Sequence, residues 1–206
     1  MCVVVAVCGF LGIVALGCGG IGTPCGVGDR FNMKATITAV PGIAQDAPMT
    51  AKADDFSVIS VVGTHNISVT QAGGGTTATL HYISVTAEGV ASESRTFIDP
   101  TKKDVPFFVV VVQWDSGLIK SVTFRDTCDG TACSYSSSAH PCVGAASKMN
   151  CAEDITICIQ PNQNCDVKIY LYHVGTDKNG VPMTSYDLLP NRYASFSFGD
   201  MFNDLR

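Results

Sequence analysis

The sequence predicts an all-β or β-dominated fold, either an antiparallel β-sandwich or a curved, barrel-like sheet, with a disulfide-rich C-terminal region. Short runs of alternating apolar and polar residues recur along the chain and are separated by Gly, Pro, Asn or Asp. Thr, Ser, Val and Gly are plentiful while long runs of Ala, Leu, Glu and Lys are missing, which favours strands over helices. Six cysteines lie close together between Cys128 and Cys165, which indicates a cross-linked region.

Residues 1–22 are expected to be a signal peptide or a membrane anchor. The stretch 2–16 is apolar and uncharged and is followed by small residues, as in a secretory signal and its cleavage site. No Lys or Arg precedes it, and Ala15-Leu16-Gly17 only approximates the cleavage motif. Three alternatives therefore stay open: a cleaved signal, a membrane anchor and a buried core helix. Residues 15–18 also resemble a bacterial lipobox, which implies lipidation of Cys18.

Residues 23–127 are expected to form a β-sheet domain. The clearest alternation covers residues 32–40 and stops at Pro41-Gly42. Gly73-Gly74-Gly75 is expected to be a turn between strands, because no helix with Lys-Ser or Lys-Thr follows it to make a phosphate-binding loop. Further strands are expected at residues 56–62, 66–71, 77–86, 92–98, 106–114 and 118–125.

The clearest local structure is a β-hairpin at residues 107–124. Its loop is Asp115-Ser116-Gly117, and a three-residue loop with a final glycine suits a bulged hairpin. Residues 107–112 are apolar on both faces, so the first strand is expected inside the sheet with cover on each side. The hairpin and the strands before it resemble the lipid-holding N-terminal sheet of large lipid-transfer proteins, which implies a carrier for an apolar ligand.

Residues 128–206 are expected to form a disulfide-clamped β extension packed on the same domain. Residues 127–150 show little periodicity, so their order is expected to depend on cross-links. Strands are expected at 154–160, 166–174 and 193–198, and a tight turn at 177–180, where Asn-Gly favours positive φ.

Disulfides are the expected state of the clustered cysteines. Ten cysteines in 206 residues are dense for a cytosolic protein, and no C-x2-C pair gives the spacing of a zinc site. The spacing does not choose among the pairings. The candidate disulfide residues are Cys128, Cys133, Cys142, Cys151, Cys158 and Cys165, with Cys18 and Cys25 added if both remain in the mature chain.

Two other residues are candidate sites. Asn66 begins the sequon Asn-Ile-Ser and is a predicted glycosylation position in an exported eukaryotic chain. Trp114 is the only tryptophan; it either stacks on a ligand at the hairpin tip or covers the core. His140 lies within the cysteine cluster, but a cysteine in a disulfide is not a nucleophile. The turn at 177–180 lacks the closing Glu of a calcium loop.

The function that these observations favour is that of a secreted or cell-surface module with a binding or structural role in an extracellular assembly. Its expected partners are surface proteins or glycans, with lipid as a further candidate. The 13 basic and 18 acidic residues leave no excess positive charge for nucleic acid.

Two alternatives remain, and no cofactor or metal is expected for any of the three. The first is a carrier of an apolar ligand in a curved sheet. The second is an extracellular hydrolase, which needs paired carboxylates. The acidic candidates for it are Asp115, Asp126, Asp129, Glu153 and Asp154.

Overall fold

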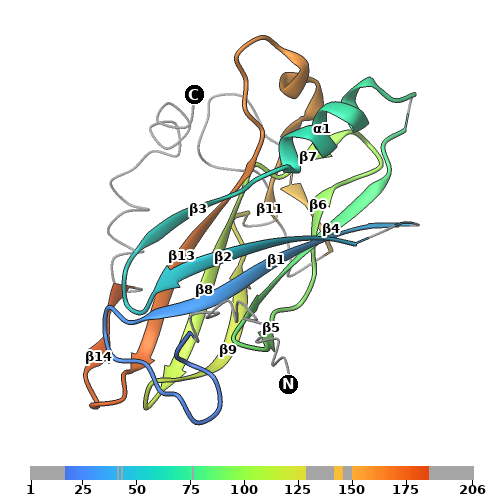
Figure 1. The fold of residues 1–206 in the computed structure, drawn as a ribbon. Helices are drawn as coiled ribbons and strands as arrows, with labels where there is room; N and C mark the ends of the chain where they lie inside the picture. Colours follow the sequence, from blue (N-terminus) through green and yellow to red (C-terminus); the bar gives the residue numbers. More distant parts are fainter. Residues whose placement is uncertain are drawn as a thin grey trace, which may run out of the picture.

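The computed structural model describes residues 17–40, 42, 44–75, 77–128, 142–145 and 150–185, and it is dominated by strands (Figure 1). The strands are β1 (Arg30–Val40), β2 (Ala44–Lys52), β3 (Ser57–Val61), β4 (Leu80–Ala87), β5 (Val90–Ala91), β6 (Arg95–Ile98), β7 (Lys103–Asp104), β8 (Phe107–Asp115), β9 (Leu118–Arg125), β10 (Cys142–Val143), β11 (Asn150–Cys151), β12 (Glu153–Asp154), β13 (Val167–Thr176) and β14 (Pro182–Met183). The helices are α1 (Thr64–Gly73) and the 3-10 helix η1 (Ile155–Ile159).

Two sheets face each other, which confirms the predicted β-dominated fold. The first has the order β12-β7-β6-β4-β1-β2, with β5 paired to β4, and the second has the order β14-β13-β8-β9, with β3 paired to β13. At one edge β2 lies beside β3, and at another β5 lies beside β9, so the sheets approach each other in a curved, barrel-like arrangement. Figure 1 shows β1 and β2 crossing in front of β8 and β13. A short third sheet joins β10 to β11.

The inner faces of the two sheets share one apolar core. The predicted alternation is clearest in β1, where every second residue from Phe31 to Ile37 is buried. From the opposite sheet, Phe108, Val110 and Val112 of β8 pack into the same core. The remaining core members include Ile83, Val85, Trp114, Ile119, Val122, Phe124, Ile169 and Leu171.

The β8–β9 hairpin is confirmed, with a different turn from the one expected. Asp115 pairs with Leu118, so only Ser116 and Gly117 form the turn, and both have positive φ (52° and 78°). Two such residues make the turn type that follows the twist of a hairpin. A Cβ on Gly117 would also lie 2.8 Å from the Lys178 amide nitrogen, so this position requires glycine. The bulge lies further along the hairpin: the register shifts between Gln113 and Trp114, so Lys120 of β9 has no opposite residue on β8.

Both faces of β8 are buried, as its apolar sequence predicts. On the face away from the core, Phe107, Val109 and Val111 form a second cluster with Tyr170 and Tyr172 of β13. The pairing of β8 with β13 was not predicted. These two strands run parallel, whereas every other recorded strand pair is antiparallel. A strand from the C-terminal region therefore lies inside the second sheet, between β8 and β3.

Strand β2 is absent from the strands expected from the sequence. Its segment contains Pro48, which lacks the N–H needed within a sheet. The structure accommodates Pro48 because, among the described strands, β2 pairs only with β1 and forms the edge of the first sheet.

The strand predicted at residues 66–71 is wrong, because these residues belong to α1. Ile67, Val69 and Thr70 are β-branched and disfavour a helix by only about 0.7 kcal/mol or less per residue. Long-range contacts with Asp166, just before β13, and with η1 outweigh that preference. The glycines at 73–75 consequently end a helix instead of linking two strands, and the Gly74 amide donates to the Thr70 carbonyl.

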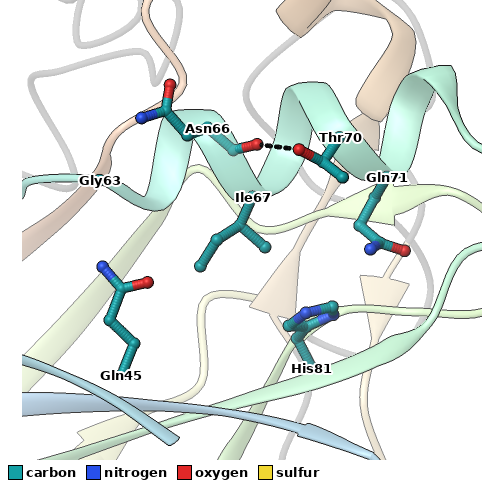
Figure 2. Close-up of a pocket in the computed structure, with 7 residues that line it drawn as sticks. All are labelled: Gln45, Gly63, Asn66, Ile67, Thr70, Gln71 and His81. Atoms are coloured by element: carbon teal, nitrogen blue, oxygen red, sulfur yellow. Dashed lines mark hydrogen bonds between the residues drawn. The ribbon is translucent and has the colours of Figure 1, made fainter. Parts of the chain in front are cut away.

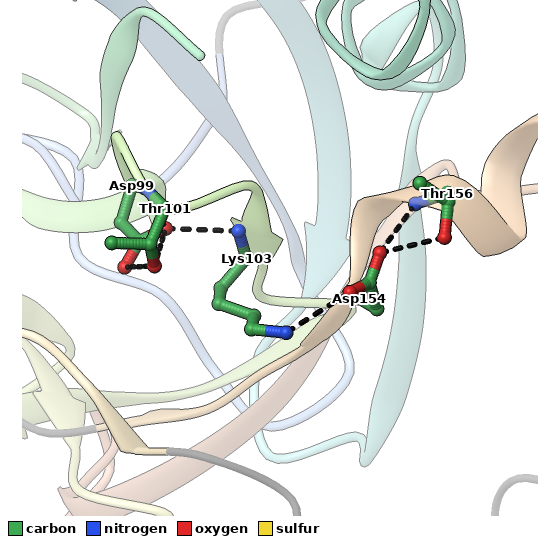
Figure 3. A network of polar contacts seen from close by, with 5 residues as sticks. All are labelled: Asp99, Thr101, Lys103, Asp154 and Thr156. Atoms are coloured by element: carbon green, nitrogen blue, oxygen red, sulfur yellow. Dashed lines mark hydrogen bonds and ion pairs between the residues drawn. The ribbon is translucent and has the colours of Figure 1, made fainter. Parts of the chain in front are cut away.

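The strand predicted at residues 154–160 is also wrong beyond its first residue. Figure 3 shows Asp154 between Lys103 and Thr156. Its Oδ1 accepts from the Thr156 amide (3.0 Å) and hydroxyl (2.6 Å), which caps η1, while its Oδ2 lies 3.0 Å from Lys103 Nζ. These hydrogen bonds, with that of Lys103, lower the pKa of Asp154 to about 2. Asp99 in turn accepts from the Lys103 amide, so one polar network fixes β7 and η1 together.

Three disulfides join described cysteines: Cys18–Cys25, Cys128–Cys142 and Cys158–Cys165. Cys151 is also disulfide-bonded, whereas Cys133 lies outside the described residues, as do the predicted strand 193–198 and His140. The Cys18 sulfur is engaged by Cys25 and so does not carry the thioether lipid that the lipobox resemblance implied. Within the described ranges, no helix has the length and apolar character to cross a bilayer.

Candidate ligand-binding site

A pocket of about 380 Å³ lies between α1 and the first sheet (Figure 2). Three elements supply its walls: β2, α1 with the residue before it, and the start of β4. None of its lining residues is an Asp, Glu, Lys or Arg. They are Gln45, Gly63, Asn66, Ile67, Thr70, Gln71 and His81.

The peptide groups of Thr79 fix two polar side chains on one side of this pocket, Gln71 and His81. The Thr79 amide donates to Gln71 Oε1 (2.7 Å), which leaves the Gln71 amide nitrogen as a hydrogen-bond donor. The Thr79 carbonyl lies 2.8 Å from His81 Nδ1, and because a carbonyl only accepts, Nδ1 carries the hydrogen. The Nε2 atom of a neutral His81 is then an acceptor. The pocket thus presents one oriented donor and one oriented acceptor.

Gln45 completes the polar lining from the opposite side. Figure 2 shows its amide rising from β2 toward α1, with Ile67 pointing down between Gln45 and His81. Gly63 has φ of 96°, and a Cβ there would lie 3.0 Å from Gln45 Nε2. The positive φ favours glycine, and the missing side chain lets the Gln45 amide approach closely. The site therefore offers amide donors and acceptors around one apolar side chain.

The helix wall of the pocket is held by a distant carboxylate. Gly63, the residue before α1, has no capping side chain, and Asp166 takes that role. Its Oδ1 accepts from the backbone amides of Gly63 and His65, both at 3.0 Å. A carboxylate at this end of a helix satisfies unpaired amides and complements the helix dipole. The Cys165 amide adds a hydrogen bond to His65 Nδ1 (3.1 Å).

A second carboxylate lies beneath α1. Asp104 of β7 is 3% exposed, and its Oδ2 accepts from the Ser68 hydroxyl at 2.8 Å. Burial raises the pKa of Asp104 to about 7; the Ser68 hydrogen bond opposes this shift, and Glu153 reinforces it. The Cys158 and Cys165 sulfurs complete a compact group whose ligand-type atoms all lie within 4.8 Å. Both sulfurs are in a disulfide, which does not bind a metal as a thiolate does.

Replacing Asp166 tests how α1 is held. The Asp166→Ala variant is expected to lose about 1–2 kcal/mol of unfolding free energy, because the first amides of α1 lose their acceptor. Asp166→Asn keeps an oxygen acceptor and is the matched control, with a smaller loss expected. Urea denaturation and hydrogen exchange of the α1 amides measure both effects. Equal stability and equal α1 exchange in the two variants and the wild type would contradict this role.

The two non-cysteine candidate residues lie in different environments. Asn66 is exposed on α1 and lines the pocket, with its amide directed away from Gln45 and His81 in Figure 2; its glycosylation stays a prediction. Trp114 is 2% exposed and packs edge-on against Phe31. Of its two proposed roles, the structure places it in the core and not at a ligand-binding surface. Sequence reasoning did not identify Gln45, Gln71 or His81.

The acidic candidates for a hydrolase do not form a described pair. Asp115 lies 3.4 Å from Lys120, and Asp126 pairs with Arg95, which is buried. Asp154 caps η1, and Asp129 lies outside the described residues. Asp115, Asp126 and Asp154 therefore each lie beside a cation, which for Asp154 is Lys103.

A family model matches most of the chain. Searches of curated proteins and of solved structures returned no match to the chain. The model of the family described as "Uncharacterised protein DDB_G0273449" matches residues 30–203, from the first residue of β1 to beyond the end of the described chain. The match covers both sheets, α1 and the pocket between α1 and the first sheet. The chain therefore belongs to this family.

Proposed function

We propose that the protein is a secreted or cell-surface binding module whose pocket between α1 and the first sheet takes an uncharged, hydroxyl-rich ligand, such as a saccharide. Export is supported by the described disulfides, since such bonds persist in oxidising compartments and are rare in the cytosol. A binding role is supported by a pocket that β2, α1 and β4 build together from side chains between residues 45 and 81.

The observation that carries the choice of ligand is the pairing of Gln71 and His81 through Thr79. An alcohol hydroxyl accepts one hydrogen bond and donates another. It therefore matches a donor from the Gln71 amide and an acceptor at His81 Nε2. The absence of Asp, Glu, Lys and Arg from the lining gives no charge complement for an ionic ligand. Ile67 supplies an apolar contact for the C–H face of a sugar ring.

The carrier and hydrolase alternatives have less support from the described residues. Carriers of apolar ligands keep a cavity between their sheets, whereas the inner faces here are packed with buried side chains such as Phe31 and Phe108. Of the acidic side chains considered for hydrolysis, Asp115 and Asp126 pair with cations, and Asp154 both caps η1 and pairs with Lys103. Both alternatives stay predictions.

Substitution of Gln71 tests the proposed site. A panel of neutral saccharides is titrated into the oxidised protein, and the tightest is carried forward. Gln71→Ala is expected to raise its dissociation constant about tenfold, the effect of one lost hydrogen bond of about 1.4 kcal/mol. Gln113→Ala is the matched control, because Gln113 is an exposed glutamine on β8, in the other sheet. Equal weakening in both variants would contradict the assignment, as would failure of every saccharide to bind.

A further inference from the structure

We infer that Cys158–Cys165 is a site of thiol–disulfide exchange, in which an external thiol attacks Cys165 and Asp104 supplies the proton to the departing Cys158. This inference does not depend on saccharide binding, so failure of either test leaves the other proposal intact. It rests on the different exposure of the two sulfurs and on the carboxyl group beside one of them.

The two cysteines differ in access. Cys158, on η1, is 2% exposed, whereas Cys165, in the loop before β13, is half-buried. An external thiolate therefore reaches Cys165 and not Cys158. Attack at a disulfide sulfur expels the other sulfur as a thiolate. A thiolate at Cys158 is left in an apolar, buried position, where an unneutralised charge is costly.

Asp104 stands where that charge is neutralised. Its Oδ2 lies 3.6 Å from Cys158 Sγ. In the oxidised protein this is a contact without a hydrogen bond, since neither sulfur of a disulfide carries a hydrogen. After reduction the same two atoms are placed for a hydrogen bond between thiol and carboxylate. The Ser68 hydroxyl, 2.8 Å from Oδ2, holds the carboxyl group in this position.

The proton and electron balance of the exchange is complete with an external monothiol. The attacking thiolate forms a bond to Cys165, the Cys158–Cys165 bond breaks, and the proton of the Asp104 carboxyl group passes to Cys158. A second thiolate attacks the sulfur of the bound monothiol and releases Cys165. Two external thiols are then oxidised to one disulfide, and the protein disulfide has gained two electrons.

The groups around Asp104 favour its protonated form near neutral pH. Burial raises the pKa of Asp104 to about 7, and Glu153 on the paired strand β12 acts in the same direction. From α1, Ser68 donates to it and His65 lies at the Cys165 amide; on its own strand, Lys103 is directed to Asp154. A buried carboxyl group with such a pKa is a suitable acid at pH 6 to 7.

The chain contains its own matched control for this exchange. Cys18–Cys25 has the same sequence separation of 7 and also joins a half-buried cysteine to a buried one. Attack at the half-buried Cys18 expels Cys25, and among the described residues no carboxyl group is recorded in a hydrogen bond with either sulfur; the Cys18 sulfur lies 3.2 Å from the Arg30 carbonyl oxygen. Reduction of this disulfide therefore reports thiol attack without a recorded carboxyl contact.

The test is reduction of the folded protein by glutathione between pH 5 and 8.5, with alkylation and peptide mapping of each disulfide. Rates are divided by the thiolate concentration. For Cys158–Cys165 the normalised rate is expected to fall at least tenfold as pH rises through 7, the size of a general-acid contribution. For Cys18–Cys25 it is expected to stay constant. Asp104→Asn, which keeps the shape but has no proton to give, is expected to abolish the fall.

Two results would overturn the inference. One is a parallel pH profile for the two disulfides in the wild-type protein, a comparison that needs no variant. The other is an unchanged profile for Cys158–Cys165 in a folded Asp104→Asn variant. Asp46→Asn controls for a general effect of removing one charge, because Asp46 is an exposed carboxylate on β2 in an ion pair with Lys34.

Discussion

Replacing Trp114 with alanine is expected to lower the free energy of unfolding by about 3–5 kcal/mol, the loss typical of deleting a large buried aromatic side chain. The indole packs edge-on against Phe31, with ring centroids 5.2 Å apart, and its Nε1 donates to His173 Nδ1 at 3.0 Å. Burial lowers the pKa of His173 to about 4, so the ring is neutral at pH 7 and Nδ1 accepts. The variant loses both packing and this hydrogen bond.

Urea denaturation of three variants separates these contributions. Trp114→Phe keeps much of the apolar volume and loses the hydrogen bond, for an expected loss of about 1–3 kcal/mol. Val62→Ala alters a side chain that is 73% exposed and is expected to change stability by less than about 0.5 kcal/mol. A Trp114→Ala protein as stable as Val62→Ala would show that the indole is not a core residue.

Replacing Asp104 with asparagine is expected to make stability less dependent on pH. In the unfolded chain this carboxyl group has its ordinary pKa of 3.8, and in the folded protein the value is raised to about 7. Between these values folding takes up a proton, so the stabilisation present below pH 3.8 is lost as pH rises to 7. At about 1.4 kcal/mol per pKa unit, the loss approaches roughly 4 kcal/mol.

His173 makes stability rise with pH, opposite to Asp104, and it does so in the wild type and in Asp104→Asn alike. The difference in unfolding free energy between the two proteins therefore isolates the effect of Asp104. The lowered pKa of His173 gives stability that is present above pH 6.5 and lost as pH falls to 4. Unfolding free energies are measured by urea denaturation with the disulfides intact at pH 4, 5.5, 7 and 8. The unfolding free energy of Asp104→Asn is expected to increase relative to that of the wild type as pH rises from 4 to 7. A constant difference would contradict the raised pKa.

Local sequence predicted those elements whose interactions are themselves local. The β8–β9 hairpin follows from an apolar strand, a Ser-Gly turn and a second strand that are adjacent in the chain. Even there the register shift lies within the strands, between Gln113 and Trp114, instead of in the turn. The alternation in β1 was equally informative, since one face of that strand covers the core.

The failures have long-range causes. Residues 66–71 have the composition of a strand, and Asp166, about a hundred positions further along the chain, caps the helix that they form. The parallel pairing of β13 with β8 joins two strands that are far apart in the chain, and neither segment indicates which strand it pairs with. The pocket could not be predicted either, because Gln45, Gln71 and His81 match no motif and only the packing of α1 on the first sheet brings them together. Of the residues that line the pocket, only Asn66 was a candidate site in the sequence, because it begins a glycosylation sequon.

The measurement that tests the account most directly is amide chemical-shift mapping of a saccharide titration on the oxidised, isotope-labelled protein. The largest changes are expected on Gln45, Ile67, Gln71 and His81, which line the pocket. Gln71→Ala is expected to reduce these changes, and Gln113→Ala is expected to leave them intact. Changes centred elsewhere on the two sheets, or none with any saccharide in the panel, would contradict it.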